Sequence, residues 1–191
     1  VGTYMNCFLS RFDSTPNEMG WLKYRKNKAT FIKNLKIREL WYRPYLHTSS
    51  SLLDWEYVSG NSKSIIKLEG KLHAELQKCK LLILDHPGTT WNIAMAMNTP
   101  IICFWKREHF PFNKEANAFL NRFQSLGLYF DTSDKAAKKV NSIIKDNVDL
   151  SQWWNQNEIQ KLRMEWMKTY AKSDKNWFWT WNKALWKLNS Y

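Results

Sequence analysis

Residues 81–105 read LLILDHPGTTWNIAMAMNTPIICFW, and this stretch decides the fold of the chain. The apolar run at 81–84 is bounded by polar residues, which is typical of a strand covered on both faces in a parallel sheet. A short helix is expected from Thr89 or Thr90 to Met97, and a second apolar run follows at 101–105. Two strands and a helix joined by such short connections predict a right-handed parallel β-α-β unit.

The alternation of strands and helices continues on both sides of this unit. We expect strands at 3–9, 40–42 and 128–130, and helices at 23–35, 68–77, 114–126 and 134–144, the last capped by Ser133. Gly127 follows residues 114–126 as the left-handed residue that ends a helix. Residues 151–191 are helical in pattern and dense in tryptophan. The pattern predicts one α/β domain, a Rossmann-like doubly wound parallel sheet with a helical C-terminal extension.

The composition narrows the class of protein and its partners. The chain has 191 residues and three cysteines without C-x-x-C spacing, so we expect one domain, reduced thiols and no metal site. We find neither a membrane-spanning run nor a signal peptide, and we therefore expect a cytoplasmic protein. A net charge of +12 favours an anionic partner. Nucleic acid, anionic lipid and nucleotide phosphate all qualify, but no nucleic-acid-binding motif is present, and a solvated lysine-rich surface is the ordinary alternative.

The turn at residues 85–90, DHPGTT, has the chemistry of an anion site. Ligands of open parallel sheets bind beyond the carboxyl ends of the strands, where this turn lies. Pro87 fixes the backbone, Gly88 allows close approach of a ligand, and Thr89 and Thr90 offer hydroxyl donors at the positive end of a helix. His86 can add a charge-assisted hydrogen bond. The alternative is an ordinary turn with a threonine cap, in which Asp85 only bonds neighbouring amides.

The same stretch resembles a family of transferases found with bacterial O-antigen and surface-polysaccharide genes. The resemblance extends from Leu40 to the end of the chain. It rests on Arg43-Pro44-Tyr45, Asp54-Trp55, Asp85 to Thr90, Trp91, Ala94, Ala96, Asn98, Pro100, Ile102, Phe104, Trp105, Trp153-Trp154 and Gln160. Where the family has a glutamate that in related enzymes contacts the donor ribose, this chain has Ile93, with Asn92 beside it.

The resemblance implies a glycosyltransferase of the GT-B fold, of which this chain is similar to the C-terminal half. Residues 1–150 would bind a nucleotide-activated sugar, and helices in 151–191 would pack on the same domain. Because the chain starts at Val1, we expect a fragment whose partner is an N-terminal GT-B domain. A His-Pro turn resembles transferases that use CMP-activated ulosonic acids, so CMP-Kdo is the first donor considered and UDP- or CDP-sugars come next. The acceptor would be a glycan or a lipid-linked glycan, and no cofactor or metal is expected.

The implied roles of individual residues each have a plainer alternative. Phosphate or nucleotide binding falls to Arg43, His86, Pro87, Gly88, Thr89, Thr90 and Asn92, and the catalytic candidates are Asp54 and His86. Arg43 has a surface ion pair as its alternative, and Asp54 a turn role, which we slightly favour. Trp105, Lys106 and Arg107 are candidates to line the pocket, although Trp105 is more simply a core residue.

The tryptophan-rich end of the chain has two interpretations. Trp177, Trp181, Leu185 and Leu188 fall on one helical face, with lysines elsewhere. Packing across a domain interface is the interpretation we favour, and peripheral contact with the inner membrane is the second. Two rival functions also stay open: a non-catalytic carbohydrate- or protein-interaction domain with a decayed nucleotide site, and a basic nucleic-acid-binding α/β domain.

Overall fold

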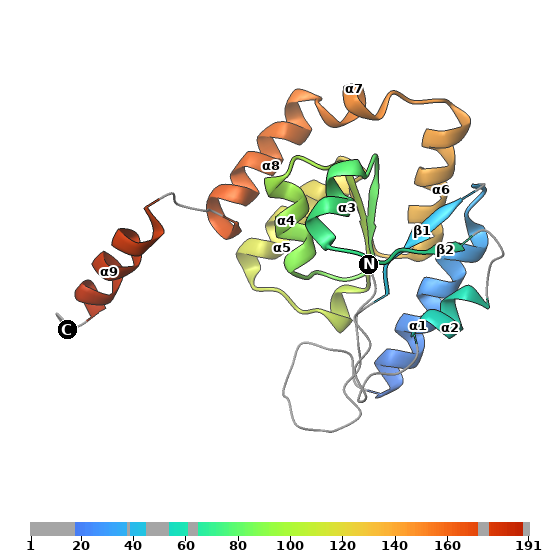
Figure 1. Cartoon of the computed structure of the whole chain (residues 1–191), viewed down its shortest axis with the longest axis horizontal. Helices are drawn as coiled ribbons and strands as arrows, with labels where there is room; N and C mark the ends of the chain where they lie inside the picture. The colour runs from blue at the N-terminus through green and yellow to red at the C-terminus, as the bar shows by residue number, and fades with distance from the viewer. Residues whose placement is uncertain (1–17, 38, 45–53, 61–64, 172–175, 189–191) are drawn as a thin grey trace.

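A computed structural model of the chain describes residues 18–37, 39–44, 54–60, 65–171 and 176–188 (Figure 1). The expected strand at 3–9 lies outside these residues, as does Tyr45. The helices are α1 Glu18–Asn34, α2 Asp54–Ser59, α3 Leu72–Lys78, α4 Thr89–Ala96, α5 Lys114–Ser125, α6 Ser133–Lys145, α7 Leu150–Trp154, α8 Asn157–Tyr170 and α9 Trp177–Leu188, with a 3₁₀ turn, η1, at Arg107–His109. The strands are β1 Leu40–Tyr42, β2 Ile65–Lys67, β3 Leu82–Leu84, β4 Ile101–Phe104 and β5 Tyr129–Phe130.

The described strands form two parallel sheets. The order β3-β4-β5 pairs Leu82 with Ile101 and Cys103 with Tyr129, and β1 pairs with β2 in parallel. The predicted β-α-β unit over 81–105 is therefore confirmed, with the helix at Thr89–Ala96 between its two strands. The α/β fold class with parallel, Rossmann-like strands is confirmed as well.

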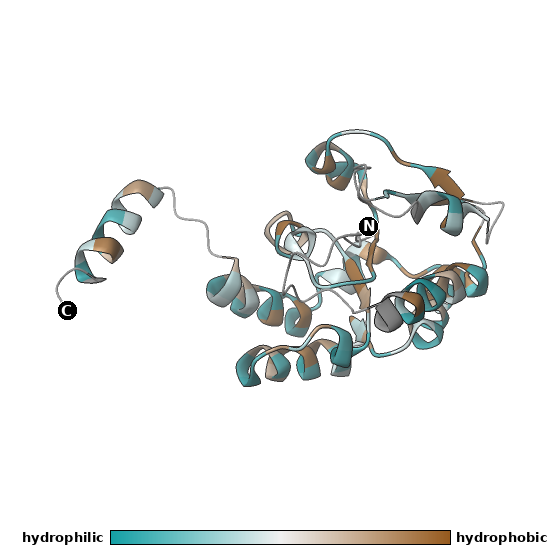
Figure 2. Ribbon diagram, turned by 90° about the horizontal axis from the view of Figure 1, so that it is seen from below, coloured by the Kyte–Doolittle hydropathy of each residue, from teal (hydrophilic) through white to brown (hydrophobic). Residues whose placement is uncertain are grey.

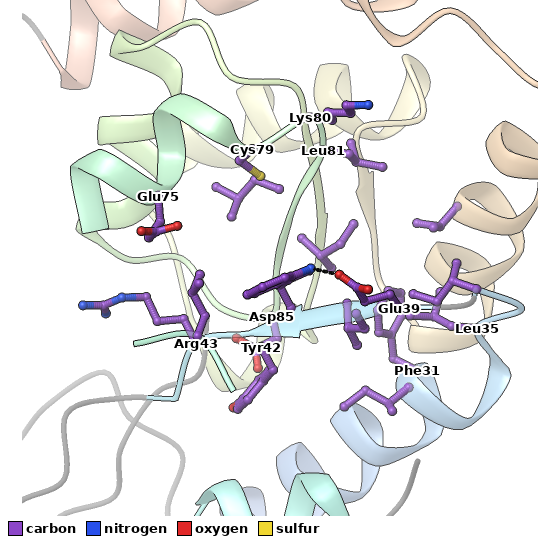
Figure 3. Close-up of a pocket in the computed structure, with 18 of the residues that line it drawn as sticks. Phe31, Leu35, Glu39, Tyr42, Arg43, Glu75, Cys79, Lys80, Leu81 and Asp85 are labelled. Atoms are coloured by element: carbon purple, nitrogen blue, oxygen red, sulfur yellow. Dashed lines mark hydrogen bonds between the residues drawn. The ribbon is translucent and has the colours of Figure 1, made fainter. Parts of the chain in front are cut away.

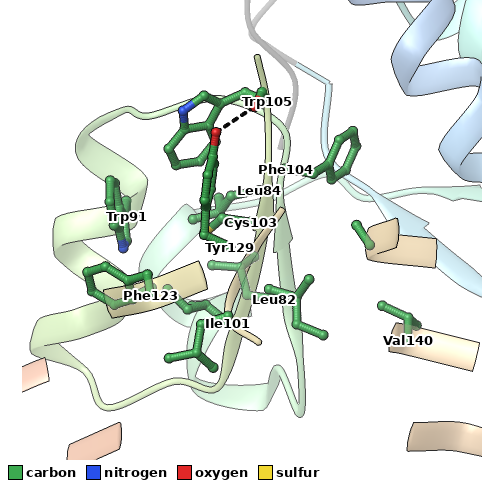
Figure 4. Close-up of a cluster of buried hydrophobic side chains, with 14 of the residues drawn as sticks. Leu82, Leu84, Trp91, Ile101, Cys103, Phe104, Trp105, Phe123, Tyr129 and Val140 are labelled. Atoms are coloured by element: carbon green, nitrogen blue, oxygen red, sulfur yellow. Dashed lines mark hydrogen bonds between the residues drawn. The ribbon is translucent and has the colours of Figure 1, made fainter. Parts of the chain in front are cut away.

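The core lies on both faces of the β3-β4-β5 sheet. All four residues of β4 are buried, as expected of a central strand covered on both sides. Figure 4 shows Trp91 and Phe123 on one face of this sheet and Phe104 and Val140 on the other. Helices α4, α5 and α8 supply the first layer, while α6, which contacts α1, supplies the second. In Figure 2 brown segments mark the apolar strands near the centre of the molecule, and the helices around them alternate between teal and brown.

Four features of the secondary structure differ from the sequence-based expectation. Strand β2 was not predicted, and the helix expected from residue 68 begins only at Leu72, because Gly70 has a φ of 136° that a helix does not admit. The cap of α6 is Thr132, whose hydroxyl accepts from the amide of Lys135, and Ser133 is the first helical residue. Residue 54 was expected in a loop but begins α2.

The helices α7 and α8 hold the carboxyl end of α4. Asn98 follows α4 with a φ of 57°, and its amide oxygen accepts hydrogen bonds from Trp154 Nε1 at 2.9 Å and Gln160 Nε2 at 3.1 Å. Arg163 Nε donates to the carbonyl oxygen of Met95 at 2.7 Å. The Arg163 contact gives a carbonyl of the last turn a further donor and places a cation at the negative end of the helix, and the other two contacts tie Asn98 to α7 and α8.

Helix α9 differs from α7 and α8 because its large side chains are exposed. Figure 1 draws it away from the sheet, and Trp177, Trp179 and Trp181 are 63%, 72% and 63% exposed. The packing that we favoured for this helix is therefore not seen among the described residues. None of the described helices is both long and apolar enough to cross a bilayer.

Candidate functional site

The DHPGTT turn connects the carboxyl end of β3 to the amino end of α4. Strand β3 ends at Leu84, α4 begins at Thr89, and Gly88 is the N-cap residue with an extended backbone and no side chain to bond the first amides. The first amide hydrogens of a helix have no partner within the helix and carry its positive end. Thr89 is exposed and Thr90 is buried. The predicted position of the turn, between a buried strand and a helix entry, is thus confirmed.

Asp85 is the centre of a buried charged cluster. Its carboxylate lies 3.2 Å from Lys28 Nζ, and it accepts a hydrogen bond of 2.6 Å from the hydroxyl of Tyr24. Asp85 is 5% exposed and Lys28 is 2% exposed, so both charges are removed from water. Lys28 also donates to the hydroxyl of Tyr42 at 3.1 Å. The cluster therefore ties α1, β1 and the turn together, and a broken pair would leave an uncompensated buried charge.

The protonation state of Asp85 follows from these neighbours. Burial favours the neutral acid and is the largest influence, but the Lys28 ammonium and the hydrogen bond with His86 outweigh it. Together they hold the pKa of the Asp85 carboxyl well below its usual range. Asp85 is therefore an ionised acceptor at neutral pH.

His86 is held over the start of α4. Its Nδ1 lies 2.9 Å from Asp85 Oδ1, and because a carboxylate can only accept, this ring nitrogen carries the hydrogen. The other ring nitrogen, Nε2, would lie 3.0 Å from a Cβ built on Gly88. The absence of a side chain at Gly88 thus allows the ring to lie against the helix entry. The geometry gives a positioned imidazole nitrogen beside the amino end of a helix.

The described residues also enclose a cavity of about 920 Å³ between α1, β1, α3, β3 and α6 (Figure 3). Its walls are mostly apolar, and Lys28, Arg43 and Asp85 lie among its lining residues. Arg43 Nη2 donates to the carbonyl oxygen of Gly70 at 3.0 Å, while its buried Nε has no hydrogen-bond partner among the described residues. Residues 86–90 are not in the described lining, so Asp85 is the residue of the turn that reaches the cavity, which Arg43 also lines.

Asn92 lies on the side of α4 that faces α8. Its amide oxygen accepts a hydrogen bond of 2.9 Å from Trp166 Nε1, so that acceptor is already in use within the domain. Contact between Asn92 and a ribose stays a prediction. Asp54 is the first residue of α2, and its side chain lies outside what the structure describes, so its catalytic role also stays a prediction.

The three residues proposed to line a pocket after β4 have different environments. Trp105 is 1% exposed and packs edge-on against Trp91, which agrees with its plainer interpretation as a core residue. Arg107 donates to the side-chain oxygens of Asn121 and Gln124 on α5. Lys106 is exposed beside Glu108. Among the described residues no three His, Cys, Asp or Glu side chains are grouped as metal ligands.

Sequence reasoning missed two members of the Asp85 cluster, Tyr24 and Lys28. Both come from α1, one helical turn apart, and Tyr24 is 61 residues away from Asp85. A signal existed, because Lys28 lies on the same helical face as the apolar residues Tyr24, Phe31 and Ile32. A lysine on the buried face of a helix requires an acidic partner.

The fold and the turn define a Rossmann-like α/β protein with a positioned histidine at a helix entry, which is an arrangement typical of anion binding. Comparison with protein families gives a more specific assignment. The model of the LIC12162 family transferase matches residues 1–185, and the chain therefore belongs to that family of transferases. No curated protein and no solved structure matches the chain significantly.

Proposed function

We propose that the chain is the donor-binding part of a glycosyltransferase, in which the DHPGTT turn binds the phosphate of a nucleotide-activated sugar. The observation that carries the proposal is the position of His86, fixed by Asp85 and lying against Gly88 at the amino end of α4. Membership of a transferase family supports a group-transfer reaction. A positioned imidazole beside the first amide hydrogens of a helix suits an anionic group better than a neutral one.

The proposed reaction breaks the bond between the anomeric carbon of the sugar and a phosphate oxygen. An acceptor hydroxyl attacks that carbon, the bonding electron pair stays on the phosphate oxygen, and the hydroxyl proton passes to a base. Negative charge on the leaving phosphate would be stabilised by His86 and the amide hydrogens of Thr89 and Thr90. The buried Asp85 carboxylate would hold the His86 ring in place through its Nδ1–H, and a hydrogen on Nε2 would be needed for the ring to donate to the phosphate. Asp54 is the proposed carboxylate base or nucleophile.

The finer assignment concerns the donor, the acceptor and the pathway. We propose CMP-ulosonic acids such as CMP-Kdo as first donors and UDP- or CDP-sugars as second ones, for transfer to a surface polysaccharide or O-antigen glycan, free or lipid-linked. The chain would be the C-terminal half of a GT-B enzyme at the cytoplasmic side of the inner membrane, and an N-terminal half would contribute most of the acceptor site. Arg43 is the proposed second phosphate clamp, supported by its Nε, which has no hydrogen-bond partner among the described residues.

A thermal-shift panel of CMP, CDP, UDP and GDP tests the proposal. A nucleotide at 100 times its dissociation constant stabilises the folded state by about 2.7 kcal/mol, which corresponds to a rise of about 5–10 °C in Tm for a chain of this size. We expect this rise with CMP, and its loss in His86→Ala. The matched control is His73→Ala, an exposed histidine on α3, which should keep the full rise.

Two results would contradict the donor-site proposal. Either no nucleotide raises Tm, or His86→Ala keeps the rise unchanged. The first result combined with salt-sensitive binding to DNA would favour the nucleic-acid alternative.

A second candidate function, a carbohydrate- or protein-interaction domain with a decayed nucleotide site, is favoured by one observation. The family glutamate is replaced by Ile93, and the neighbouring Asn92 oxygen is occupied by Trp166. This alternative predicts glycan binding without any nucleotide effect on Tm. The same panel, repeated with a soluble glycan, separates the two functions.

A further inference from the structure

Helix α9 presents a broad aromatic surface to the outside of the molecule. Its exposed apolar residues, here called the aromatic face, are Trp177, Phe178, Trp179, Trp181, Leu185 and Trp186. At about 100° per residue these side chains, with Ala184, spread over an arc of roughly 220°. Asn182 also falls within this arc, and its amide nitrogen donates to the carbonyl oxygen of Phe178 at 2.7 Å. A helix that packs on a protein core usually buries a narrower stripe of aliphatic residues. An apolar arc this wide and this rich in tryptophan therefore suits an environment other than the surface of a protein core.

The remaining arc of α9 is polar and basic. Thr180, Lys183 and Lys187 fall within roughly 60° of one another, opposite the centre of the aromatic face. The helix contains no Asp or Glu, so its charge is purely positive, and the whole chain carries a net charge of +12. Positive charge beside an apolar surface is complementary to an anionic surface with an apolar interior.

We propose that α9 is a membrane-docking helix that lies flat in the headgroup region of an anionic phospholipid bilayer. Tryptophan prefers this region because its ring is apolar while its N–H bonds to water and headgroups. Lysines at the edge of such a helix extend their ammonium groups to lipid phosphates while their methylene stems stay apolar. Twelve residues span only about 18 Å, so α9 lies in the interface and does not cross a hydrocarbon core of about 30 Å.

A protein partner explains these features less well than a bilayer does. A protein groove would need acidic groups to match two lysines and a deep trough to cover most of the helix circumference. A bilayer surface supplies anionic headgroups and apolar chains together, over any required area. The docking helix is independent of the donor site, so each proposal can fail without the other.

Vesicle sedimentation of the full chain tests the docking helix. The vesicles contain phosphatidylcholine alone or with about 30% phosphatidylglycerol, and part of the lipid carries brominated acyl chains that quench nearby tryptophan. We expect the chain to sediment with the anionic vesicles, with quenching of tryptophan fluorescence. Replacement of Lys183 and Lys187 by glutamine should weaken this binding roughly 30-fold, because each lysine near an anionic surface contributes about fivefold. The triple variant Trp177→Ala/Trp181→Ala/Leu185→Ala should abolish the quenching.

Matched controls come from helix α8. Met164→Ala removes an exposed apolar side chain, and Lys161→Gln/Lys168→Gln removes two exposed lysines, each without touching α9. Both controls should bind the anionic vesicles within about twofold of the unchanged chain. Far-UV circular dichroism and Tm of the α9 variants should match those of the unchanged chain, since the replaced side chains are exposed.

The docking helix is refuted if the chain does not sediment with anionic vesicles at low salt. It is also refuted if the α8 lysine variant loses as much binding as the α9 lysine variant, because attraction would then be a property of the general surface. A third overturning result is a dimer in light scattering that the triple α9 variant dissociates, which would assign the aromatic face to a second copy of the chain.

Discussion

Replacing Lys28 by methionine tests the buried cluster that fixes the DHPGTT turn. The ammonium lies 3.2 Å from the Asp85 carboxylate, and both side chains are almost fully buried. Removing one partner of a buried ion pair costs about 3–5 kcal/mol, because the other charge is left in a poor solvent. Tyr24 and His86 still bond the carboxylate, so we expect a loss near the lower end, about 3 kcal/mol at neutral pH.

The pH dependence of this loss has a defined sign. In the unchanged chain the folded pKa of Asp85 lies below its unfolded value of about 3.9, so its contribution to stability is present above that pH and is lost as pH falls. Without Lys28, burial raises the pKa of the Asp85 carboxyl in the folded variant above its value in the unfolded chain. The carboxyl then takes up a proton on folding. The variant is then relatively more stable in acid. The difference in unfolding free energy should therefore shrink between about pH 7.5 and about pH 4.5.

Urea unfolding followed by tryptophan fluorescence measures the difference at both pH values. Lys26→Met, an exposed lysine on the same helix, is the matched control and should change stability by less than about 0.5 kcal/mol. The double variant Lys28→Met/Asp85→Asn should recover most of the loss, because no unpaired charge remains. A loss below about 1 kcal/mol at neutral pH, or an equal loss at both pH values, would refute the reasoning.

Two further substitutions test the turn and the α4–α8 contact. Gly88→Ala should leave the unfolding free energy within about 1 kcal/mol, since its φ of −141° suits any residue, but the new methyl group would lie 3.0 Å from His86 Nε2. The ring must move, so the rise in Tm with CMP should fall; an unchanged rise would separate His86 from the donor phosphate. Asn92→Ala should cost about 1–3 kcal/mol in urea unfolding because Trp166 Nε1 loses its acceptor. A loss no larger than that of Asn157→Ala, an exposed asparagine at the start of α8, would show that this hydrogen bond does not stabilise the domain.

The central β-α-β unit could be predicted because its signals are local. The apolar runs that became β3 and β4 are continuous and bounded by polar residues, and Gly127, with a φ of 68°, marks the end of α5 as expected. Strand β2 carries no such signal, since it has three residues and only Ile65 is half-buried. Its pairing with β1 is decided by tertiary contacts, which override weak local preference.

The candidate site was predictable only in part, because some of its contacts are local in sequence and others join distant segments. The turn itself is a local motif, and so its position between strand and helix followed from the sequence. The ion pair of Asp85 with Lys28 joins distant segments, and no local pattern specifies which acid a buried lysine meets. Thr132 and Ser133 are both common caps, so the sequence could not distinguish them, and the structure selects Thr132.

The contacts of Arg163, Trp154 and Gln160 at the far end of α4 have a consequence for how the chain can be shortened. The groups proposed to stabilise the leaving phosphate, on His86, Thr89 and Thr90, lie before residue 91. The direction of α4 is nevertheless fixed at its carboxyl end, by side chains of α7 and α8. Deleting about the last forty residues would keep every residue of the DHPGTT turn. It would remove the contacts that fix the carboxyl end of α4, so the helix could change its orientation. Amide hydrogens throughout that helix would then exchange with solvent faster, although no group at its amino end had been touched.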